Sequence, residues 1–122
     1  MFDERSPIYR QIADQISSDV LHGVLVADEQ VMSTNQYATF YRINPATAAK
    51  AFQLLVDEEV LYKRRGLGLF VAPGARELLQ ARHRERFYPE VIEPMLREAE
   101  AIGITRDDLI AYIAGTSSEE EK

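Results

Sequence analysis

Residues 44–71 read NPATAAKAFQLLVDEEVLYKRRGLGLFV and carry the clearest structural signals in the chain. Asn44 followed by Pro45 is a typical helix opening, because asparagine caps free backbone N–H groups and proline fits the first turn. Apolar residues then recur with helical spacing, at Ala48, Ala51, Phe52 and Leu55. Two short strand-like runs follow at 61–63 and 69–71, and the glycines between them permit the positive φ of a hairpin turn. We therefore expect a helix followed by a β-hairpin.

Two further helices are expected upstream of this stretch. The first opens at Ser6-Pro7 and ends at Gly23, and its apolar stripe contains Ile8, Ile12, Ala13, Ile16 and Val20. The second begins at Ser33 or Thr34 and runs to Tyr41. The order helix, helix, tight turn, helix and hairpin is typical of a winged helix-turn-helix domain. The expected fold class is therefore mainly α with a small β-hairpin.

A change in composition at Ala72-Pro73-Gly74 marks the expected domain boundary, because two breakers end an apolar run there. Residues 1–73 would form the winged helix-turn-helix domain, residues 74–115 a short C-terminal helical dimerisation segment, and residues 116–122 a disordered acidic tail. Pro89 and Pro94 should break or kink the helices of the C-terminal segment. A capping box from Thr105 to Asp108 should open its last helix, which Gly115 should close.

The C-terminal segment has more apolar stripes than so short a chain buries by itself. A second copy of the chain would cover them, because a two-fold homodimer uses the same patch on both subunits. The alternative is that these helices fold back on their own N-terminal domain. The residues expected at the dimer interface are Leu78, Leu79, Ile92, Met95, Leu96, Ala99, Ile102, Leu109, Ile110 and Ile113.

Composition excludes several classes of function. The chain has 122 residues, of which 46% are hydrophobic and none is cysteine, so it folds without disulfides or thiolate metal sites. His22 and His83 lie far apart, and no catalytic or metal-binding motif surrounds either of them. We expect neither an enzyme nor a cofactor. Without a long apolar run or an export signal in residues 1–5, we expect a cytoplasmic protein with no membrane partner.

The net charge of −6 is opposite to that of most nucleic-acid-binding proteins, so DNA binding must depend on local charge. The small residues that open the helix after Asn44 allow close approach to another surface, and Lys63-Arg64-Arg65 would gather cations on the hairpin. The alternatives are a solvated helix face and a solvated turn. The residues expected to contact DNA are Asn44, Ala46, Thr47, Lys50, Lys63, Arg64, Arg65 and Gly66.

The sequence resembles the GntR family of bacterial transcription regulators, and within it the small YtrA-like branch. The stretches that carry the resemblance are Pro7-Ile8-Tyr9-Arg10-Gln11-Ile12, Gly23-Val24-Leu25, residues 43–47, Lys50-Ala51-Phe52 and residues 61–71. The resemblance implies a repressor, often of a transporter operon, that releases DNA on sensing a small molecule. It also adds Ser33, Thr34 and Asn35 to the expected DNA contacts, because they stand in the family's Leu-Pro-Ser-x-Arg stretch.

Four positions depart from the family pattern. Asn35 stands where a DNA-contacting arginine is usual, and asparagine cannot make the bidentate guanine contact of arginine. Asp28 and Glu59 each replace a glycine, and Ala46 stands where the branch often has asparagine. These departures predict an operator that differs from the family norm, or weaker binding.

The leading hypothesis is a homodimeric repressor that binds double-stranded DNA at a pseudo-palindromic operator, since two recognition helices would read successive major grooves. A pocket for a small-molecule effector would lie between the dimer helices and the winged domain, lined by Tyr88, Met95 and Tyr112. The alternative is that these residues are core, which is the more common role of aromatic and Met residues at helical spacing. The acidic total charge and Asn35 favour an alternative, a winged-helix protein-interaction module without DNA binding.

Overall fold

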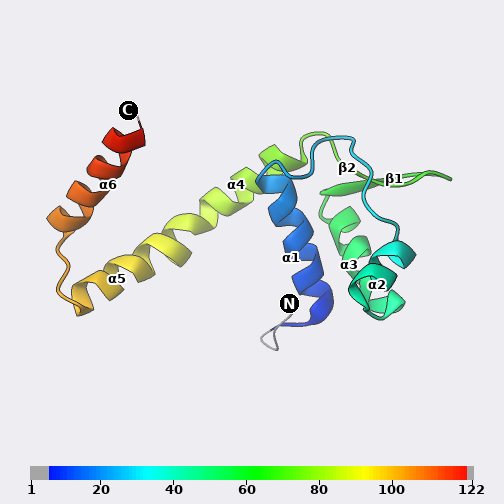
Figure 1. Cartoon of the computed structure of the whole chain (residues 1–122), viewed down its shortest axis with the longest axis horizontal. Coiled ribbons are helices and arrows are strands. Elements are labelled where there is room, and N and C mark those ends of the chain that lie inside the picture. Colours follow the sequence, from blue (N-terminus) through cyan, green and yellow to red (C-terminus); the bar gives the residue numbers. More distant parts are fainter. Residues whose placement is uncertain (1–5, 121–122) are drawn as a thin grey trace. The chain divides into compact units, whose positions relative to one another are not determined.

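The structure is a computed structural model that describes residues 6–120, with side chains described as far as Gly115. The elements in chain order are α1 (Ile8–Leu21), α2 (Thr34–Tyr41), α3 (Pro45–Asp57), β1 (Leu61–Arg64), β2 (Gly68–Val71), α4 (Ala75–Phe87), the π-helix η1 (Tyr88–Ile92), α5 (Glu93–Ala101) and α6 (Arg106–Glu120) (Figure 1). The chain divides into an N-terminal unit, Met1–Arg82, and a C-terminal unit, His83–Lys122.

The core of the N-terminal unit forms around α3, which packs against both α1 and α2. The buried stripe of α3 contains Ala48, Ala51, Phe52 and Leu55, as its spacing predicts. The buried stripe of α1 contains Ile12, Ala13, Ile16 and Val20, whereas Ile8 is 45% exposed. Helix α1 starts at Ile8 with Pro7 as its N-cap, one residue later than expected. The three helices therefore form the compact body that carries the wing.

The ends of α2 and α3 show why the chain makes a tight turn between them. Ser33 caps α2 in a reciprocal capping box with Gln36, so the helix starts at Thr34. Arg42 ends α2 in the left-handed region at φ 55°. The Ala46 N–H then donates to Asn44 Oδ1 at 2.8 Å, which caps α3 as the Asn-Pro opening predicts. The turn is tight because the Arg42 C-cap of α2 and the Asn44 N-cap of α3 are only two residues apart.

The wing, residues 61–71, is an antiparallel hairpin in which Leu61 pairs with Val71 and Arg64 with Gly68. Residues 28–31 run along β2 as an additional edge. The Asp28 N–H donates to the Val71 carbonyl at 2.8 Å, the Val31 N–H donates to the Leu69 carbonyl at 3.0 Å, and Gln30 forms a bridge with Phe70. The loop after α1 thus stiffens the wing from one side.

The start of α4 belongs to the N-terminal unit. Ala75 and Leu79 are buried in the same core as α1 and α3. Arg82 Nη1 donates to the Glu58 carbonyl at 3.0 Å, which ties the helix to the end of α3. The division of the chain therefore comes nine residues later than Pro73. Leu79, one of the residues expected at a dimer interface, is 5% exposed because the core of its own unit covers it.

In the C-terminal unit, Pro89 and Pro94 do not break the helical backbone. Pro89 lies in the π-helix η1, and Pro94 is the second residue of α5, which follows η1 directly in a continuous helical backbone. Helix α5 ends before Gly103, whose φ is 81°. The wider turn of η1 accommodates the proline that was expected to interrupt the helix.

Helix α6 opens with the predicted capping box. The Thr105 N–H donates to Asp108 Oδ2 at 3.0 Å, and the Asp108 N–H donates to Thr105 Oγ1 at 3.1 Å. Gly115 does not close the helix, which continues to Glu120. Residues 116–120 of the expected disordered tail are therefore helical, and residues 121 and 122 lie outside the described part. Among residues 6–120, no helix is long and apolar enough to cross a membrane.

Candidate nucleic-acid interface

The first turn of α3 presents a small, accessible surface. Asn44 and Ala46 are exposed, and Thr47 is half-buried. Asn44 Oδ1 is occupied by the capping bond, so its side-chain amide N–H groups are the ones that remain for an acceptor on DNA. Since Ala46 has only a methyl group, the backbone of this turn can approach another surface closely.

Lys50 follows on the exposed side of α3, and an aromatic ring holds it. Its ammonium nitrogen lies 4.1 Å from the centroid of the Tyr9 ring in α1. Such cation–π contacts restrict a flexible lysine without neutralising its charge. The sequence pattern contains no signal for this contact, because Tyr9 and Lys50 are far apart in the chain and neither lies on a predicted apolar stripe.

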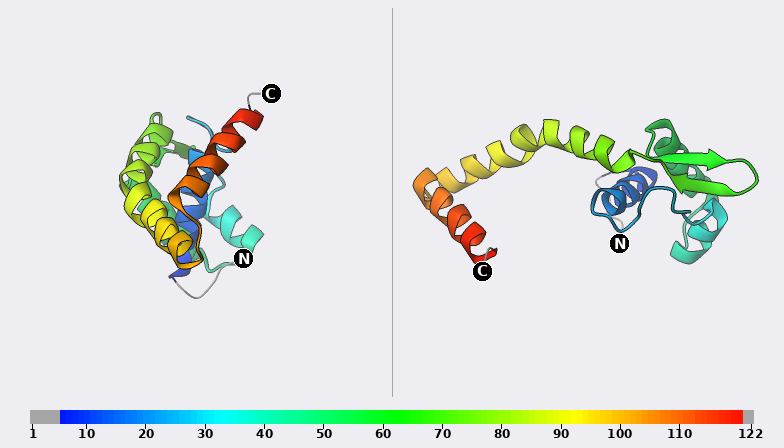
Figure 2. Two further views of the ribbon diagram at one scale, coloured as in Figure 1. Left: turned by 90° about the vertical axis from the view of Figure 1, so that its left-hand side faces the viewer. Right: turned by 90° about the horizontal axis from the view of Figure 1, so that it is seen from above.

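A hollow of about 360 Å³ brings together residues from α2, α3 and the wing. Figure 1 and the right-hand view in Figure 2 both place the hairpin beside these two helices. Ser33 and Thr34 reach the hollow from the start of α2, Gln53 from α3 and Lys63 from β1. Three of these four residues, Ser33, Thr34 and Lys63, are predicted DNA contacts. Asn35 is exposed but does not line the hollow.

The cations of the wing do not form the single cluster that their sequence suggests. Side chains alternate along a strand, so Lys63 and Arg64 point to opposite faces of the hairpin. Lys63 lines the hollow beside α3, while Arg64 stacks on the opposite face, with its guanidinium carbon 4.3 Å from the centroid of the Phe70 ring. Arg65 and Gly66 occupy the exposed turn, where Gly66 has a φ of 78°.

Arg64 takes part in a cluster that sequence reasoning missed. Its Nη2 lies 3.4 Å from Asp28 Oδ1 and also donates to the hydroxyl of Tyr62. The Tyr62 hydroxyl in turn donates to Asp28 Oδ1 at 2.5 Å, and this hydrogen bond raises the pKa of Tyr62. The only sequence signal was that Asp28 replaces a glycine of the family.

The backbone explains why glycine is usual at two of the departing positions. Asp28 has a φ of 66° and Glu59 a φ of 65°, both in the left-handed region that disfavours side chains with a Cβ. Glu59 is exposed at the turn between α3 and β1. The resemblance thus located two strained turns that periodicity alone does not reveal.

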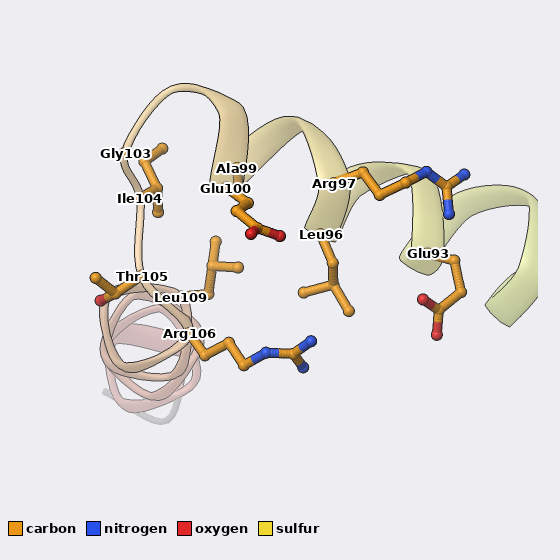
Figure 3. Close-up of a pocket in the computed structure, with 10 residues that line it drawn as sticks. All are labelled: Glu93, Leu96, Arg97, Ala99, Glu100, Gly103, Ile104, Thr105, Arg106 and Leu109. Carbon is orange, nitrogen blue, oxygen red and sulfur yellow. The ribbon is translucent and has the colours of Figure 1, made fainter.

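The C-terminal unit holds a second hollow, of about 490 Å³, between α5 and α6. Leu96 from α5 and Leu109 from α6 both point into it, as Figure 3 shows. Its polar rim contains Glu93, Arg97, Glu100 and Arg106. Tyr88, Met95 and Tyr112, the expected effector contacts, do not line it and are exposed.

The residues expected at the dimer interface differ widely in exposure. Ile102, Ile110 and Ile113 are 64%, 64% and 59% exposed, and Met95 is also exposed. Leu78, Ile92, Leu96 and Leu109 are half-buried. Ala99 is 6% exposed and lies against the turn into α6, where the Ile104 N–H donates to its carbonyl. Within the described residues, no group of three His, Cys, Asp or Glu side chains is placed to hold a metal ion.

No model of a protein family matches the chain, but whole proteins and solved structures do. The transcriptional repressor YtrA of Bacillus subtilis is 27% identical over 119 residues, which cover 96% of this chain and 91% of YtrA. The crystal structure of a GntR-family regulator from Bacteroides thetaiotaomicron is 30% identical, has a TM-score of 0.70, and matches over 93% of this chain and 98% of that one. This chain belongs to the GntR family of transcriptional regulators.

Family membership confirms the winged helix-turn-helix fold and the YtrA-like resemblance. It also confirms that the chain is not an enzyme, because GntR-family proteins are regulators without catalytic activity. The DNA-binding domain of AraR, solved in complex with an operator, is 28% identical with a TM-score of 0.54. The match spans 59% of this GntR-family chain and 93% of the AraR domain.

Proposed function

We propose that this GntR-family regulator is a homodimeric repressor that binds a pseudo-palindromic operator through α2, α3 and the wing. The observation that carries this proposal is the hollow at which Ser33, Thr34 and Lys63 meet beside the exposed face of α3. Residues from three elements converge there, although the chain as a whole carries a net charge of −6. The likeness to an AraR DNA-binding domain solved in complex with an operator supports operator DNA as the ligand of this domain.

Each residue of the interface has a role that its chemistry suits. Ala46 and Thr47, at the start of α3, would contact base edges, with the Thr47 methyl suited to a thymine methyl. Lys50 and Lys63 would neutralise phosphates, and the Asn44 amide would donate to a phosphate oxygen. Arg65 and Gly66 would place the turn of the wing against the backbone or a groove edge, since Gly66 has no side chain to obstruct approach.

The dimer would form through the C-terminal unit. Its exposed isoleucines, Ile102, Ile110 and Ile113, lie on a unit too short to bury them, and a second copy would remove them from water. Two α3 helices would then reach successive major grooves if they lie about 34–36 Å apart. The two-fold axis of such a dimer is what requires a pseudo-palindromic operator.

The regulated operon would be of transporter type, and a small-molecule effector would release the DNA. The hollow between α5 and α6 is the place where such a molecule would act, because it combines Leu96 and Leu109 with charged residues on its rim. Effector binding there would alter the surface that the dimer uses. A screen of transporter substrates by thermal shift, followed by DNA release, tests this part of the proposal.

The direct test is selection of bound fragments from a genomic library, followed by affinity measurements over a salt series. Arg65→Ala and Lys63→Ala should each reduce the slope of log affinity against log salt by about one, because each removes one phosphate contact. The Arg76→Ala variant serves as the matched control, since Arg76 donates to the Leu21 carbonyl away from the interface. Unchanged slopes for both wing variants would remove the wing from the DNA interface. Capture of a specific protein without DNA retention at low salt would favour the protein-interaction alternative.

A further inference from the structure

We propose that Tyr62, Arg64 and Phe70 form a seat for a DNA backbone phosphate, and that the Asp28 carboxylate fills this seat while DNA is absent. We call these three residues the outer seat, because they lie on the face of the wing opposite Lys63. The inference rests on the proposed DNA-binding function and adds an internal competitor to it.

The outer seat is built to hold an anionic oxygen. The Arg64 guanidinium stacks on Phe70 and lies 5.3 Å from the centroid of the Tyr62 ring, which fixes its plane. Tyr62 directs its hydroxyl hydrogen at Asp28 Oδ1, the same oxygen that faces Arg64 Nη2. A phosphate oxygen has the same charge and accepts the same two donors. Asp28 therefore stands where a phosphate would be recognised.

The seat also has donors to spare. Arginine carries five N–H donors, and the hydrogen bonds of Arg64 to Asp28 and Tyr62 both come from Nη2. Nε and Nη1 remain for a second acceptor. A phosphate has more acceptor oxygens than a carboxylate, so it can engage more of these donors than Asp28 does.

The contact with Asp28 is weak enough for DNA to displace. The side chains of Arg64 and Asp28 are 43% and 54% exposed, and ion pairs with this exposure contribute little in water. A phosphate in duplex DNA gains in addition from the release of condensed counterions. Asp28 should therefore lower affinity for DNA without abolishing binding.

The backbone keeps the Asp28 carboxylate beside the wing. The Asp28 N–H donates to the Val71 carbonyl at 2.8 Å, so the residue is attached to β2 rather than free in a loop. Its φ of 66° suits asparagine as well as glycine, which makes Asp28→Asn a change of charge with the backbone retained. Glu59 has a similar φ of 65°, and the hydrogen bonds and ion pair of Arg64 go to Asp28 and Tyr62, so Glu59→Asn offers a matched control.

The experiment measures the affinity of the full chain for a selected duplex by fluorescence anisotropy over a salt series. Asp28→Asn should bind about fivefold more tightly at low salt, with a salt slope steeper by about one, because Arg64 becomes available to a phosphate. Glu59→Asn should leave both values unchanged. In an Arg64→Ala background, Asp28→Asn should have no effect, since the seat no longer exists.

Four outcomes would overturn the inference. An equal gain in both backgrounds would mean that Asp28 repels DNA without competing for Arg64. Weaker binding by Asp28→Asn would mean that Asp28 positions Arg64 for DNA. An unchanged affinity, with tight binding by the wild-type chain, would remove the outer seat while the proposed function stands; absence of binding by every variant would remove both.

A second measurement tests the cluster without DNA. Because the hydrogen bond to Asp28 raises the pKa of Tyr62, Asp28→Gly, which removes the acceptor and suits the positive φ, should bring that pKa back toward the ordinary tyrosine value. The phenol of Tyr62 is identified by the difference between titrations with and without Tyr62→Phe. An unchanged Tyr62 titration would show that Asp28 does not occupy the seat in solution, and the inference would fail.

Discussion

The two units of the chain differ in how far their apolar side chains are buried. Among the described residues, every buried apolar side chain except Ala99 comes before Arg82. In the C-terminal unit, Ile102 and Ile110 are both 64% exposed and Tyr112 is 75% exposed. The N-terminal unit completes a core by itself and has its polar surface free for recognition. The C-terminal unit has little core, so its apolar side chains remain exposed and available for association with another surface.

The charges of the two units follow the same division. Residues 1–82 contain nine Lys and Arg against ten Asp and Glu, whereas residues 83–122 contain five against ten. The acidity of the chain therefore belongs mainly to the unit that carries none of the expected DNA contacts. Total charge is for this reason a poor guide to DNA binding in this chain, and the distribution of charge between the units is the useful quantity.

The largest difference between the units should appear when a large apolar side chain is truncated in each. Phe52 is 2% exposed at the centre of the N-terminal core, so Phe52→Ala should lower the free energy of unfolding by about 3–5 kcal/mol. Ile110→Ala should change the unfolding of the same unit by less than about 0.5 kcal/mol, because exposed side chains contribute little to a core. Urea denaturation followed by circular dichroism measures both. Equal losses would mean that the two units share one core.

A charge placed on the apolar surface of the C-terminal unit should affect association between chains and leave the folding of the N-terminal unit unchanged. Ile110→Asp with Ile113→Asp should convert a dimer to a monomer, because each carboxylate would have to be desolvated at the interface. Sedimentation velocity over a concentration series measures the change, and unaltered urea unfolding of the N-terminal unit is its control. A wild-type chain that is monomeric at all concentrations, or a double variant that stays dimeric, would place the isoleucines outside an interface.

The sequence predicted the N-terminal unit well because local rules determine most of it. Asn44 before Pro45, the helical spacing of Ala48 to Leu55, and the glycines of the wing each specify a structure within a few residues. The capping box at Thr105 was predicted in the same way. Pairing of distant residues had no comparable signal, so the contacts of Lys50 with Tyr9 and of Arg64 with Asp28 were not predicted.

Three features differ from what the neighbouring sequence alone suggests. Leu79 fits an exposed helical stripe, yet the N-terminal core covers it. Lys63 and Arg64 are neighbours in sequence, but strand alternation places them on opposite faces of the wing. Gly115 would end an isolated helix, whereas α6 continues past it. The identity of a residue and its immediate neighbours therefore did not determine burial at Leu79, the face of the wing at Lys63 and Arg64, or the end of α6.

Turn strain in the N-terminal unit should respond oppositely at two positions. Glu59→Gly should raise the free energy of unfolding by about 1 kcal/mol, because glycine adopts a positive φ without strain and this gain exceeds its entropic cost. Gly23→Ala should lower the free energy of unfolding by a similar amount, because Gly23 has a φ of 78°. Nothing lies within 4 Å of the added methyl, so the loss would report backbone strain and not a clash. Thermal unfolding compares the two variants. A loss of stability in Glu59→Gly would mean that the Glu59 side chain makes a stabilising contact in solution.

The smallest expected effect is that of pH on the start of α6, which is stabilised by a local cap in a unit that has little core. The hydrogen bond from the Thr105 N–H lowers the pKa of Asp108 below its ordinary value, so the cap favours the charged carboxylate. A group with a lowered folded pKa contributes its full stability above the unfolded pKa and loses it as the pH falls through the folded pKa. The start of α6 should therefore loosen as the pH falls below the ordinary pKa of an aspartate, as followed by the amide signal of Thr105 in NMR.

The variant Asp108→Asn separates this cap from the other carboxylates that titrate in the same range. Its side-chain oxygen still accepts a hydrogen bond but carries no charge, so the Thr105 amide signal should no longer shift with the titration of residue 108. The amide of Gln36, capped by uncharged Ser33 in the N-terminal unit, provides a reference that should not respond to this titration. If both amides shift together in the wild-type chain and in the variant, acid acts on the whole fold, and the C-terminal unit is not held by its own local cap.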